Sequence, residues 1–467
     1  MRIVSIDIGS TWTKAALLQT HGQRLAVEAR AAVPTTVENL AQGFFRVLEA
    51  VTGSTSAISE IRSGALVLRY SSSAKGGLGV AAIGLVPSLT LEAATQAAQS
   101  AGARLTHVLP YSLTRSDIAR LEESPPDIIL LTGGTDGGDC SHVIANARSL
   151  AASGLDCPIV YAGNRAARDE VTDILNGRRP IVADNVLPAV NELAVDSARR
   201  AIAEVFLSTI VHGKGLQTII DTVGENPRPT PYSVLEFVRA IREFVPDWDR
   251  FALVDIGGAT SDFYSAATDQ STPAVVRRGL PEPPIKRSVE GDLGMRVSAQ
   301  STWENAQEIV SQILCQEPDS VSAAPQYLTR LSQQPSSLAS SPSETRIDCA
   351  LASACFVLAL RRHSGRASEV YTADGPVRIH VGRDLSQVTK VIGSGGWLSR
   401  EAHFHPQTLG ESFRIDELGK SVLAPHAFEY YRDAEYLFPL LANAATVLPE
   451  EAARTGIESL ELHGARA

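Results

Sequence analysis

The same short phrase occurs twice in this sequence, an aspartate, an isoleucine and a glycine directly after an apolar run. Asp7-Ile8-Gly9 follows residues 2–6, and Asp255-Ile256-Gly257 follows residues 251–254. A short apolar run bounded by glycine predicts a buried strand, and the glycine predicts a tight turn into a hairpin. The sequence therefore predicts two equivalent strand–turn units in distant parts of the chain.

Both predicted turns carry residues that suit a bound polyphosphate. Glycine lets the backbone approach a phosphate closely, and Ser and Thr hydroxyls add hydrogen-bond donors. An aspartate at each strand end can hold Mg²⁺ through water or orient an attacking water, so Asp7 and Asp255 are the candidate metal-binding and catalytic residues. Lys14 is a candidate to neutralise phosphate charge, or it forms only a salt bridge. The candidate phosphate-binding residues are Gly9, Ser10, Thr11, Lys14, Gly257, Gly258 and Thr260.

A third glycine-rich turn follows a predicted strand at 390–392. One Asp-x-Gly turn is weak evidence, because ordinary hairpins contain it. Gly393, Gly395 and Gly396 would let a nucleoside ring lie on bare backbone, and a side chain at Gly395 would then occupy the place of the base. Taken alone, such glycines are equally typical of a packing turn. All three turns in this order favour a nucleotide clamp between two lobes.

The order of these elements resembles the actin-like ATPase superfamily of sugar kinases, large heat-shock chaperones and actin. The resemblance implies an α/β fold of two ribonuclease H-like lobes that are hinged around ATP and Mg²⁺. It also implies a helix that connects the lobes, which we expect at 191–207, and a closing helix, which we expect at 433–446.

Further segments are similar to the glutamate mutase L family. That resemblance implies a reactivating chaperone, driven by ATP, whose partners are the subunits of an adenosylcobalamin-dependent mutase of the glutamate mutase or aminomutase type. Residues 69–75 depart from the small-residue run with cysteine that we expect in the family, so the role of the 71–79 loop stays open. The similar segments are 71–89, 130–139, 160–164, 185–191 and 288–296.

Alternating strand and helix patterns predict an α/β domain inserted between the two strand–turn units. A Ser/Pro-rich stretch at 332–346 predicts a mobile surface loop. The expected divisions are 1–61 for the first part of lobe I, 62–185 for the inserted domain, 186–249 for connecting helices and 250–467 for lobe II.

Composition excludes several classes of protein. The 467 residues carry a net charge of −10, which disfavours binding to nucleic acid or to an anionic membrane. The five cysteines form no C-x-x-C pair, which favours a reduced, cytoplasmic setting over a disulfide framework. The chain has no apolar run of about 18 residues, and its first strand begins too early for a secretory signal. An oligomer remains open.

Three functions are compatible with this pattern. The first is a slow Mg²⁺-dependent ATPase that acts as a nucleotide switch. The second is a small-molecule kinase, in which Asp262 would take the proton of a substrate hydroxyl. The third is a scaffold without hydrolysis, against which the two aspartates argue. His403 and His405 lack a nearby third ligand and are expected to be loop residues, while Cys349 and Cys355 are expected to pack in a helix.

Overall fold

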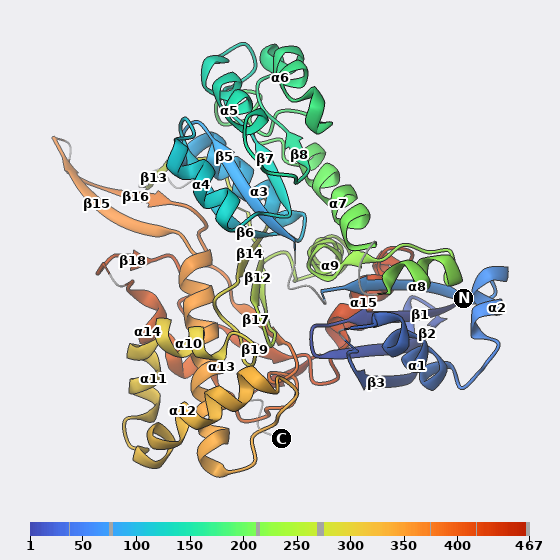
Figure 1. Cartoon of the computed structure of the whole chain (residues 1–467). Coiled ribbons are helices and arrows are strands. Elements are labelled where there is room, and N and C mark those ends of the chain that lie inside the picture. Colours follow the sequence, from blue (N-terminus) through green and yellow to red (C-terminus); the bar gives the residue numbers. More distant parts are fainter. Residues whose placement is uncertain are drawn as a thin grey trace. The chain divides into compact units, whose positions relative to one another are not determined.

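The computed structural model describes residues 1–36, 38–73, 78–211, 215–268, 275–373, 375–416 and 418–463. The chain folds into two compact units, which are shown in Figure 1. The first unit comprises Met1–Gly76, Lys214–Arg278 and Pro284–Ala467, and the second comprises Gly77–Gly213 and Gly279–Pro283.

The first unit contains a five-stranded sheet built around the first hairpin. Its strands are β1 (Arg2–Ile8), β2 (Trp12–His21), β3 (Arg24–Pro34), β4 (Val67–Ser72) and β10 (Arg228–Pro229), in the order β10-β4-β1-β2-β3. β1, β2 and β3 are antiparallel neighbours, whereas β4 and β10 run parallel to β1. Helices α1 (Leu40–Thr52) and α2 (Ala57–Ser63) connect β3 to β4. The bounds expected for the inserted domain, 62–185, include β4, which here pairs with β1.

A second sheet in the same unit repeats this topology around the second hairpin. It contains β11 (Phe251–Ile256), β12 (Ser261–Ala266), β14 (Ile285–Glu290), β17 (Lys390–Ser394), β19 (Glu429–Arg432) and β20 (Glu461–His463). Their order is β14-β12-β11-β17-β19-β20, so the first five match β3-β2-β1-β4-β10 in order and direction. β20 is an added antiparallel strand. This duplicated sheet confirms the predicted two-lobed, actin-like fold.

Helices that follow the last parallel strands pack between the two sheets. α9 (Thr230–Phe244) follows β10 and packs on β12 and β14, and α15 (Phe438–Ala444) packs on β1. Ser5 Oγ donates to the Leu440 carbonyl at 2.7 Å, and Asn443 Nδ2 donates to the Ile6 carbonyl at 3.0 Å. Together with α16 (Pro449–Glu458), they form one apolar core with both sheets. We expected a helix at 191–207 that connects the lobes. The structure has α7 (Asp196–Val211) there, and this helix belongs to the second unit. The sequence could not show this, because helical periodicity does not reveal what a helix packs against.

The outer face of the second sheet is covered by α10 (Ala299–Asn305), α11 (Gln307–Leu314), α12 (Pro318–Gln333) and α13 (Pro342–His363). The apolar run 350–360 lies buried in α13. The Ser/Pro-rich stretch 332–346 was predicted to be a mobile loop. In the structure α12 ends at Gln333 and α13 begins at Pro342, so only residues 334–341 of that stretch lie outside the helices. Ser341 caps α13, because its hydroxyl accepts from the Glu344 N–H at 3.2 Å. Short η4 (Pro406–Leu409) and α14 (Gly410–Arg414) complete this layer.

A small third sheet belongs to the same unit. It contains β13 (Val275–Arg278), β15 (Arg366–Thr372), β16 (Gly375–Val381) and β18 (Ser421–Val422), in the order β13-β16-β15-β18. β15 and β16 form a hairpin. Helix α8 (Leu216–Val223) packs on α1 and α2 beside the first sheet.

The second unit is an α/β domain with a fully parallel sheet. β5 (Gly79–Gly84), β6 (Arg104–Pro110), β7 (Ile128–Leu131), β8 (Ile159–Tyr161) and β9 (Ile181–Val182) lie in the order β6-β5-β7-β8-β9, a doubly wound arrangement. The intervening helices are η1 (Pro87–Leu91), α3 (Glu92–Ser100), α4 (Arg115–Glu123), α5 (Ser141–Ala151), η2 (Arg165–Ala167), α6 (Arg168–Ile174) and η3 (Asn176–Arg178). This unit confirms the inserted α/β domain. Within the described ranges, every helix is too short or too polar to cross a membrane.

Candidate functional site

The two glycine turns have the same hydrogen bond. The Gly9 N–H donates to the Trp12 carbonyl at 3.1 Å, and the Gly257 N–H donates to the Thr260 carbonyl at 2.9 Å. A Cβ at Gly9 would lie only 2.7 Å from the Trp12 oxygen, so glycine is required by this close approach. The repeated phrase in the sequence therefore produces two matching hairpin turns, one at the end of β1 and one at the end of β11.

The turns face each other within the first unit. A Cβ on Gly258 would lie 3.2 Å from Thr11 Oγ1, which places the second turn beside the first. Thr35 fixes the first turn, since its hydroxyl donates to the Gly9 carbonyl at 2.9 Å. The Thr11 hydroxyl of the first turn thus lies beside the backbone of the second turn, as a polyphosphate site between lobes would require.

The segment 290–298 stabilises the second turn through hydrogen bonds to its backbone carbonyls. The Met295 N–H donates to the Gly257 carbonyl at 3.0 Å, and the Arg296 N–H donates to the Gly258 carbonyl at 2.9 Å. The Arg296 side chain forms a bidentate pair with Asp348 of α13, with both bonds 3.0 Å long. The segment 288–296, noted for its family resemblance, therefore fixes the backbone of the second turn.

Asp7 lies buried at the end of β1. The Thr230 hydroxyl donates to Asp7 Oδ1 at 2.7 Å, and the Ser71 hydroxyl donates to the same oxygen at 3.3 Å. The phenol of Tyr436 reaches Oδ2 at 3.4 Å. Burial raises the pKa of Asp7, and these hydrogen bonds and the charge of Lys14 oppose that rise. Its carboxylate is oriented by residues from β4, α9 and the segment before α15.

Asp255 occupies the equivalent position at the end of β11. In the sheet register it lies opposite Asp262 of β12 and opposite Ser394 of β17. Burial raises the pKa of Asp255 to about 7, and the negative charges of Asp262, Asp7 and Asp433 add to the rise. The carboxyls of both lobes are therefore close enough to repel one another.

The positively charged side chain of Lys14 lies near the carboxylates of Asp7, Asp255 and Asp433. It lies opposite Asp7 in the β1–β2 register, and its ammonium is 2.9 Å from the centroid of the Tyr436 ring. Burial lowers the pKa of Lys14 to about 8, although the charges of Asp7, Asp255 and Asp433 oppose this effect. The sequence left two roles open for Lys14, a phosphate ligand and a salt bridge, and in this structure its ammonium lies between Tyr436 and the carboxylates.

Asp433 also belongs to the site, although the sequence indicated it only as the start of a helix. It precedes α15, and its carboxylate accepts from the Leu437 N–H at 2.7 Å, the Phe438 N–H at 3.1 Å and the Ser394 hydroxyl at 2.8 Å. The helix expected at 433–446 begins only at Phe438, and Asp433 lies before it and accepts from N–H groups at its start. Asp433 directly follows β19, whereas Asp7 and Asp255 are the next-to-last residues of β1 and β11, and the charged run 429–432 before Asp433 gave no matching signal in the sequence.

The three glycines of the predicted adenosine turn differ in their surroundings. A Cβ at Gly393, which lies inside β17, would overlap the Tyr430 phenol, and one at Gly395 would overlap the Ile256 carbonyl. Gly395 also has a φ of 108°, which favours glycine. A Cβ at Gly396 would meet no atom within 4 Å. Packing therefore explains Gly393 and Gly395, and Gly396 is the position with open space beside it.

The donor set suits a hydrated divalent cation. Asp7, Asp255 and Asp433 bring three carboxyls close to Lys14, and the charges of Asp262, Asp7 and Asp433 add to the rise in the pKa of Asp255 that burial causes. No group of three or more Asp, Glu, His or Cys side chains in the described ranges could enclose a metal ion directly. Mg²⁺ retains several waters and needs only one or two carboxylates, so the residues present fit it.

Asp262 is already bound to a buried cation. Arg287 Nε donates to Asp262 Oδ1 at 2.8 Å, and the Arg287 side chain is almost fully buried. A carboxylate oxygen that already accepts from a buried arginine has less capacity left to accept from a substrate hydroxyl. This contact weakens the assignment of Asp262 as the base of a kinase.

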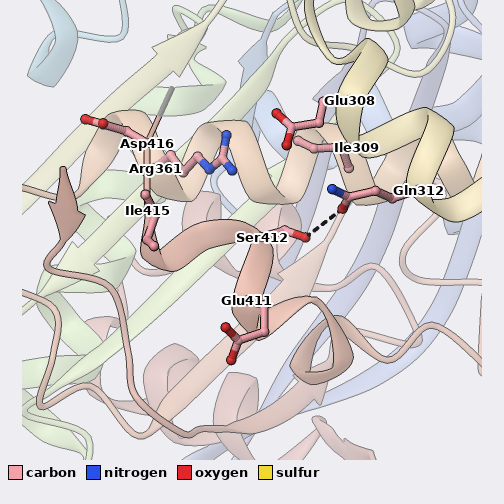
Figure 2. A pocket seen from close by; sticks show the side chains of 8 residues that line it. All are labelled: Glu308, Ile309, Gln312, Arg361, Glu411, Ser412, Ile415 and Asp416. Atoms are coloured by element: carbon pink, nitrogen blue, oxygen red, sulfur yellow. Dashed lines mark hydrogen bonds between the residues drawn. The ribbon is translucent and has the colours of Figure 1, made fainter. Parts of the chain in front are cut away.

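A separate pocket of about 220 Å³ is lined by residues of α11 and α13 and by residues in and directly after α14. Figure 2 shows the side chains that line it. Its walls are polar and partly linked to each other: Ser412 Oγ lies 3.4 Å from Gln312 Oε1, and Asp416 binds Arg366 at 2.6 Å. None of the turn residues lines it. The lining residues are Glu308, Ile309, Gln312, Arg361, Glu411, Ser412, Ile415 and Asp416.

Comparison with known proteins gives a consistent family match. The model of a family described as "MutL protein" matches residues 3–460. The "Protein MutL" of Clostridium tetanomorphum is 37% identical over 460 residues, which cover 96% of this chain and 97% of that protein.

Among solved structures, the similarities are distant. A nucleotide-free acetone carboxylase has a TM-score of 0.40 at 15% identity and covers 95% of this chain and 70% of that one. A glycerol dehydratase reactivase has a TM-score of 0.34 at 9% identity over 95% and 100% of the two chains. The activator of the 2-hydroxyisocaproyl-CoA dehydratase of Clostridium difficile, with bound ADPNP, has a TM-score of 0.28 at 12% identity over 98% of each chain. Similarities this distant do not assign a function.

Proposed function

This chain belongs to the MutL protein family, and on that premise we propose that it binds and slowly hydrolyses Mg-ATP in order to reactivate an adenosylcobalamin-dependent mutase. One observation carries the nucleotide part of this proposal. Two matching turns from two sheets face each other, and each follows a strand that ends in a buried or half-buried aspartate. The partner comes from the family resemblance.

Each turn has a defined role in this proposal. The N–H groups and hydroxyls of Ser10 and Thr11 would bind phosphate oxygens from one side, beside Gly9, whose own N–H is used within the turn. Gly258 and Thr260 would bind them from the other side, beside Gly257, whose N–H is likewise used within its turn, and Lys14 would neutralise phosphate charge. Backbone donors fixed before the substrate arrives cost no reorganisation when charge develops on the phosphate.

The aspartates would hold the metal ion and the water. Asp7 and Asp255 would bind Mg²⁺ through its water ligands, and either carboxylate would orient an attacking water. Bound Mg²⁺ would neutralise charge on the β- and γ-phosphate oxygens. The hydrogen bonds from Thr230 and Ser71 keep the Asp7 carboxylate oriented whether or not the ion is bound.

The base would lie beside the glycine turn after β17. Gly395 and Gly396 follow the parallel strand next to β11, so they approach the second phosphate turn from the same sheet. The open space at Gly396 supports a place for the ring, with Gly393 inside the strand supporting the turn. ATP that touched both turns would favour closure of the lobes, and this closure would drive the switch.

The first experiment measures ATP turnover without any added substrate. Asp7→Ala and Asp255→Ala should each abolish hydrolysis and keep the fold, as judged by circular dichroism. Asp319→Ala, at an exposed position of α12, is the matched control and should keep full turnover. Undiminished hydrolysis in both site variants would remove this site from consideration.

The second experiment tests the partner. A mutase inactivated by damaged cobalamin should recover with this protein, ATP and fresh coenzyme. Recovery should fail with Asp7→Ala and with a non-hydrolysable ATP analogue. Equal recovery in all cases would show that the ATPase cycle is irrelevant, and ATP consumption only in the presence of a sugar or other small acceptor would favour the kinase function.

A further inference from the structure

The small sheet β13-β16-β15-β18 has an open edge. β15 pairs with β16 from Arg366 to Thr372, but on its other side it pairs with β18 only at Arg366 and Ala367. Within the part of the chain that the structure describes, no strand pairs with the outer edge at 368–372. An unpaired strand edge is a template for pairing with another chain, so this edge is a candidate interaction surface.

The β15–β16 hairpin is exposed on both faces. In Figure 1 its strands extend away from the other sheets of their unit. Tyr371 is 80% exposed and Val370 is 44% exposed, although both are large apolar side chains. β15 contains neither the lysine nor the proline that commonly protects an open edge. A ribbon of this kind is only marginally stable in water unless further strands extend it.

The length and the charge of the open edge select one register for pairing with a second copy. In a twofold antiparallel pair the axis passes through one residue position, and Val370 is the midpoint of the edge at 368–372. An axis there pairs the whole edge and opposes Glu369 with Tyr371, which avoids repulsion between like charges. An axis at Glu369 would oppose two glutamates. An axis at Tyr371 would pair only 370–372, because β15 ends there.

The rest of the hairpin supports the same register. Val370 lies opposite Val377 of β16, so an axis at Val370 aligns four valines across the two copies. Glu369 lies opposite Arg378 on the other face, so each glutamate would lie between an arginine of its own chain and Tyr371 of the second copy. We propose that this chain forms a twofold dimer by antiparallel pairing of β15 edges, centred on Val370.

Sedimentation analysis tests the dimer. The wild-type chain should be dimeric at micromolar concentration. Val370→Lys opposes two ammoniums at the axis and should raise the dissociation constant about tenfold or more. Val276→Lys is the matched control, because that valine of β13 is 48% exposed on the same face but lies away from the edge. It should leave the dimer intact, and both variants should keep the wild-type circular dichroism spectrum.

A monomeric wild-type chain would overturn the proposal and leave the edge for a strand of another protein. Equal dimerisation of the Val370→Lys and wild-type chains would also overturn it, because the interface would then lie elsewhere.

Cross-linking tests the register. Opposed Cα atoms of an antiparallel pair are about 4.5–5.5 Å apart, which a disulfide can span. Val370→Cys should therefore form a reducible dimer by itself, above the background of the wild-type chain. Glu369→Cys and Tyr371→Cys should form one only when the two variants are mixed. Efficient self-cross-linking of Glu369→Cys would contradict the axis at Val370.

Discussion

The ammonium of Lys14 lies 2.9 Å from the centroid of the Tyr436 ring, on the same side of the site as Asp7. Tyr436 has a φ of 53°, which is uncommon for a large side chain. Its peptide N–H donates to the Asp433 carbonyl at 3.1 Å, which helps to hold this conformation. Tyr436, which follows β19 of the second sheet, thus positions Lys14 of the first sheet.

The Tyr436 ring should matter for nucleotide affinity through Lys14. Tyr436→Leu removes the π face and should weaken Mg-ATP binding about fivefold, which corresponds to about 1 kcal/mol. Tyr436→Phe keeps the face and should bind nearly as well as the wild type. Calorimetric titration measures both, and equal affinities of the Leu and Phe variants would disprove the role of the ring.

The Asp433 carboxylate should stabilise the fold as a helix cap. Asp433→Ala leaves the Leu437 and Phe438 N–H groups and the Ser394 hydroxyl without this acceptor, and it should lower the free energy of unfolding by about 2 kcal/mol or more. Ser341→Ala removes an exposed cap of α13 and should cost about 1 kcal/mol. Urea denaturation compares them, and a smaller loss at Asp433 than at Ser341 would contradict this account.

Two neighbouring glycines should respond differently to substitution. Gly395→Ala forces a Cβ against the Ile256 carbonyl at positive φ, so it should destabilise the fold by about 2 kcal/mol or more. Gly396→Val meets open space, so it should keep wild-type stability and weaken nucleotide binding about tenfold. Thermal melts and calorimetry separate these effects, and unchanged affinity of Gly396→Val would move the base elsewhere.

Stability should fall at mildly acidic pH because of His363. This buried ring lies between the hydroxyls of Ser265 and Ser288, each 2.8 Å from a ring nitrogen, and burial lowers its pKa well below the usual value. The unfolded chain binds the proton near pH 6.5, so the contribution of the neutral ring is complete above that pH and is lost as the pH falls below it.

Between pH 6.5 and 5, this group alone should lower the free energy of unfolding by about 2 kcal/mol. His363→Gln should have a flatter profile, whereas His403→Gln, at an exposed position, should follow the wild type. Parallel profiles for His363→Gln and the wild type would rule out this histidine as the cause.

The two glycine turns could be predicted from the sequence alone, because a hairpin turn depends on residues next to one another. Gly9 and Gly257 each lie close to the carbonyl of the residue three positions later, so the repeated phrase was sufficient to predict both turns. The two lobes with their sheets were predicted only through the resemblance to the actin-like ATPase superfamily. The family resemblance of 288–296 was also visible in the sequence, but its role in bracing Gly257 and Gly258 was not.

Which distant groups meet depends on the tertiary packing. The Asp7 carboxylate accepts from the hydroxyl of Thr230 in α9 and from that of Tyr436, which precedes α15. These contacts form because both helices pack between the two sheets. Tertiary packing also brings Asp433 to the site, and it places Gly395 directly against the Ile256 carbonyl. Local patterns encode turns and periodicity, whereas these contacts depend on how two sheets pack around shared helices. That packing is set by burial of the apolar core, which no single segment specifies.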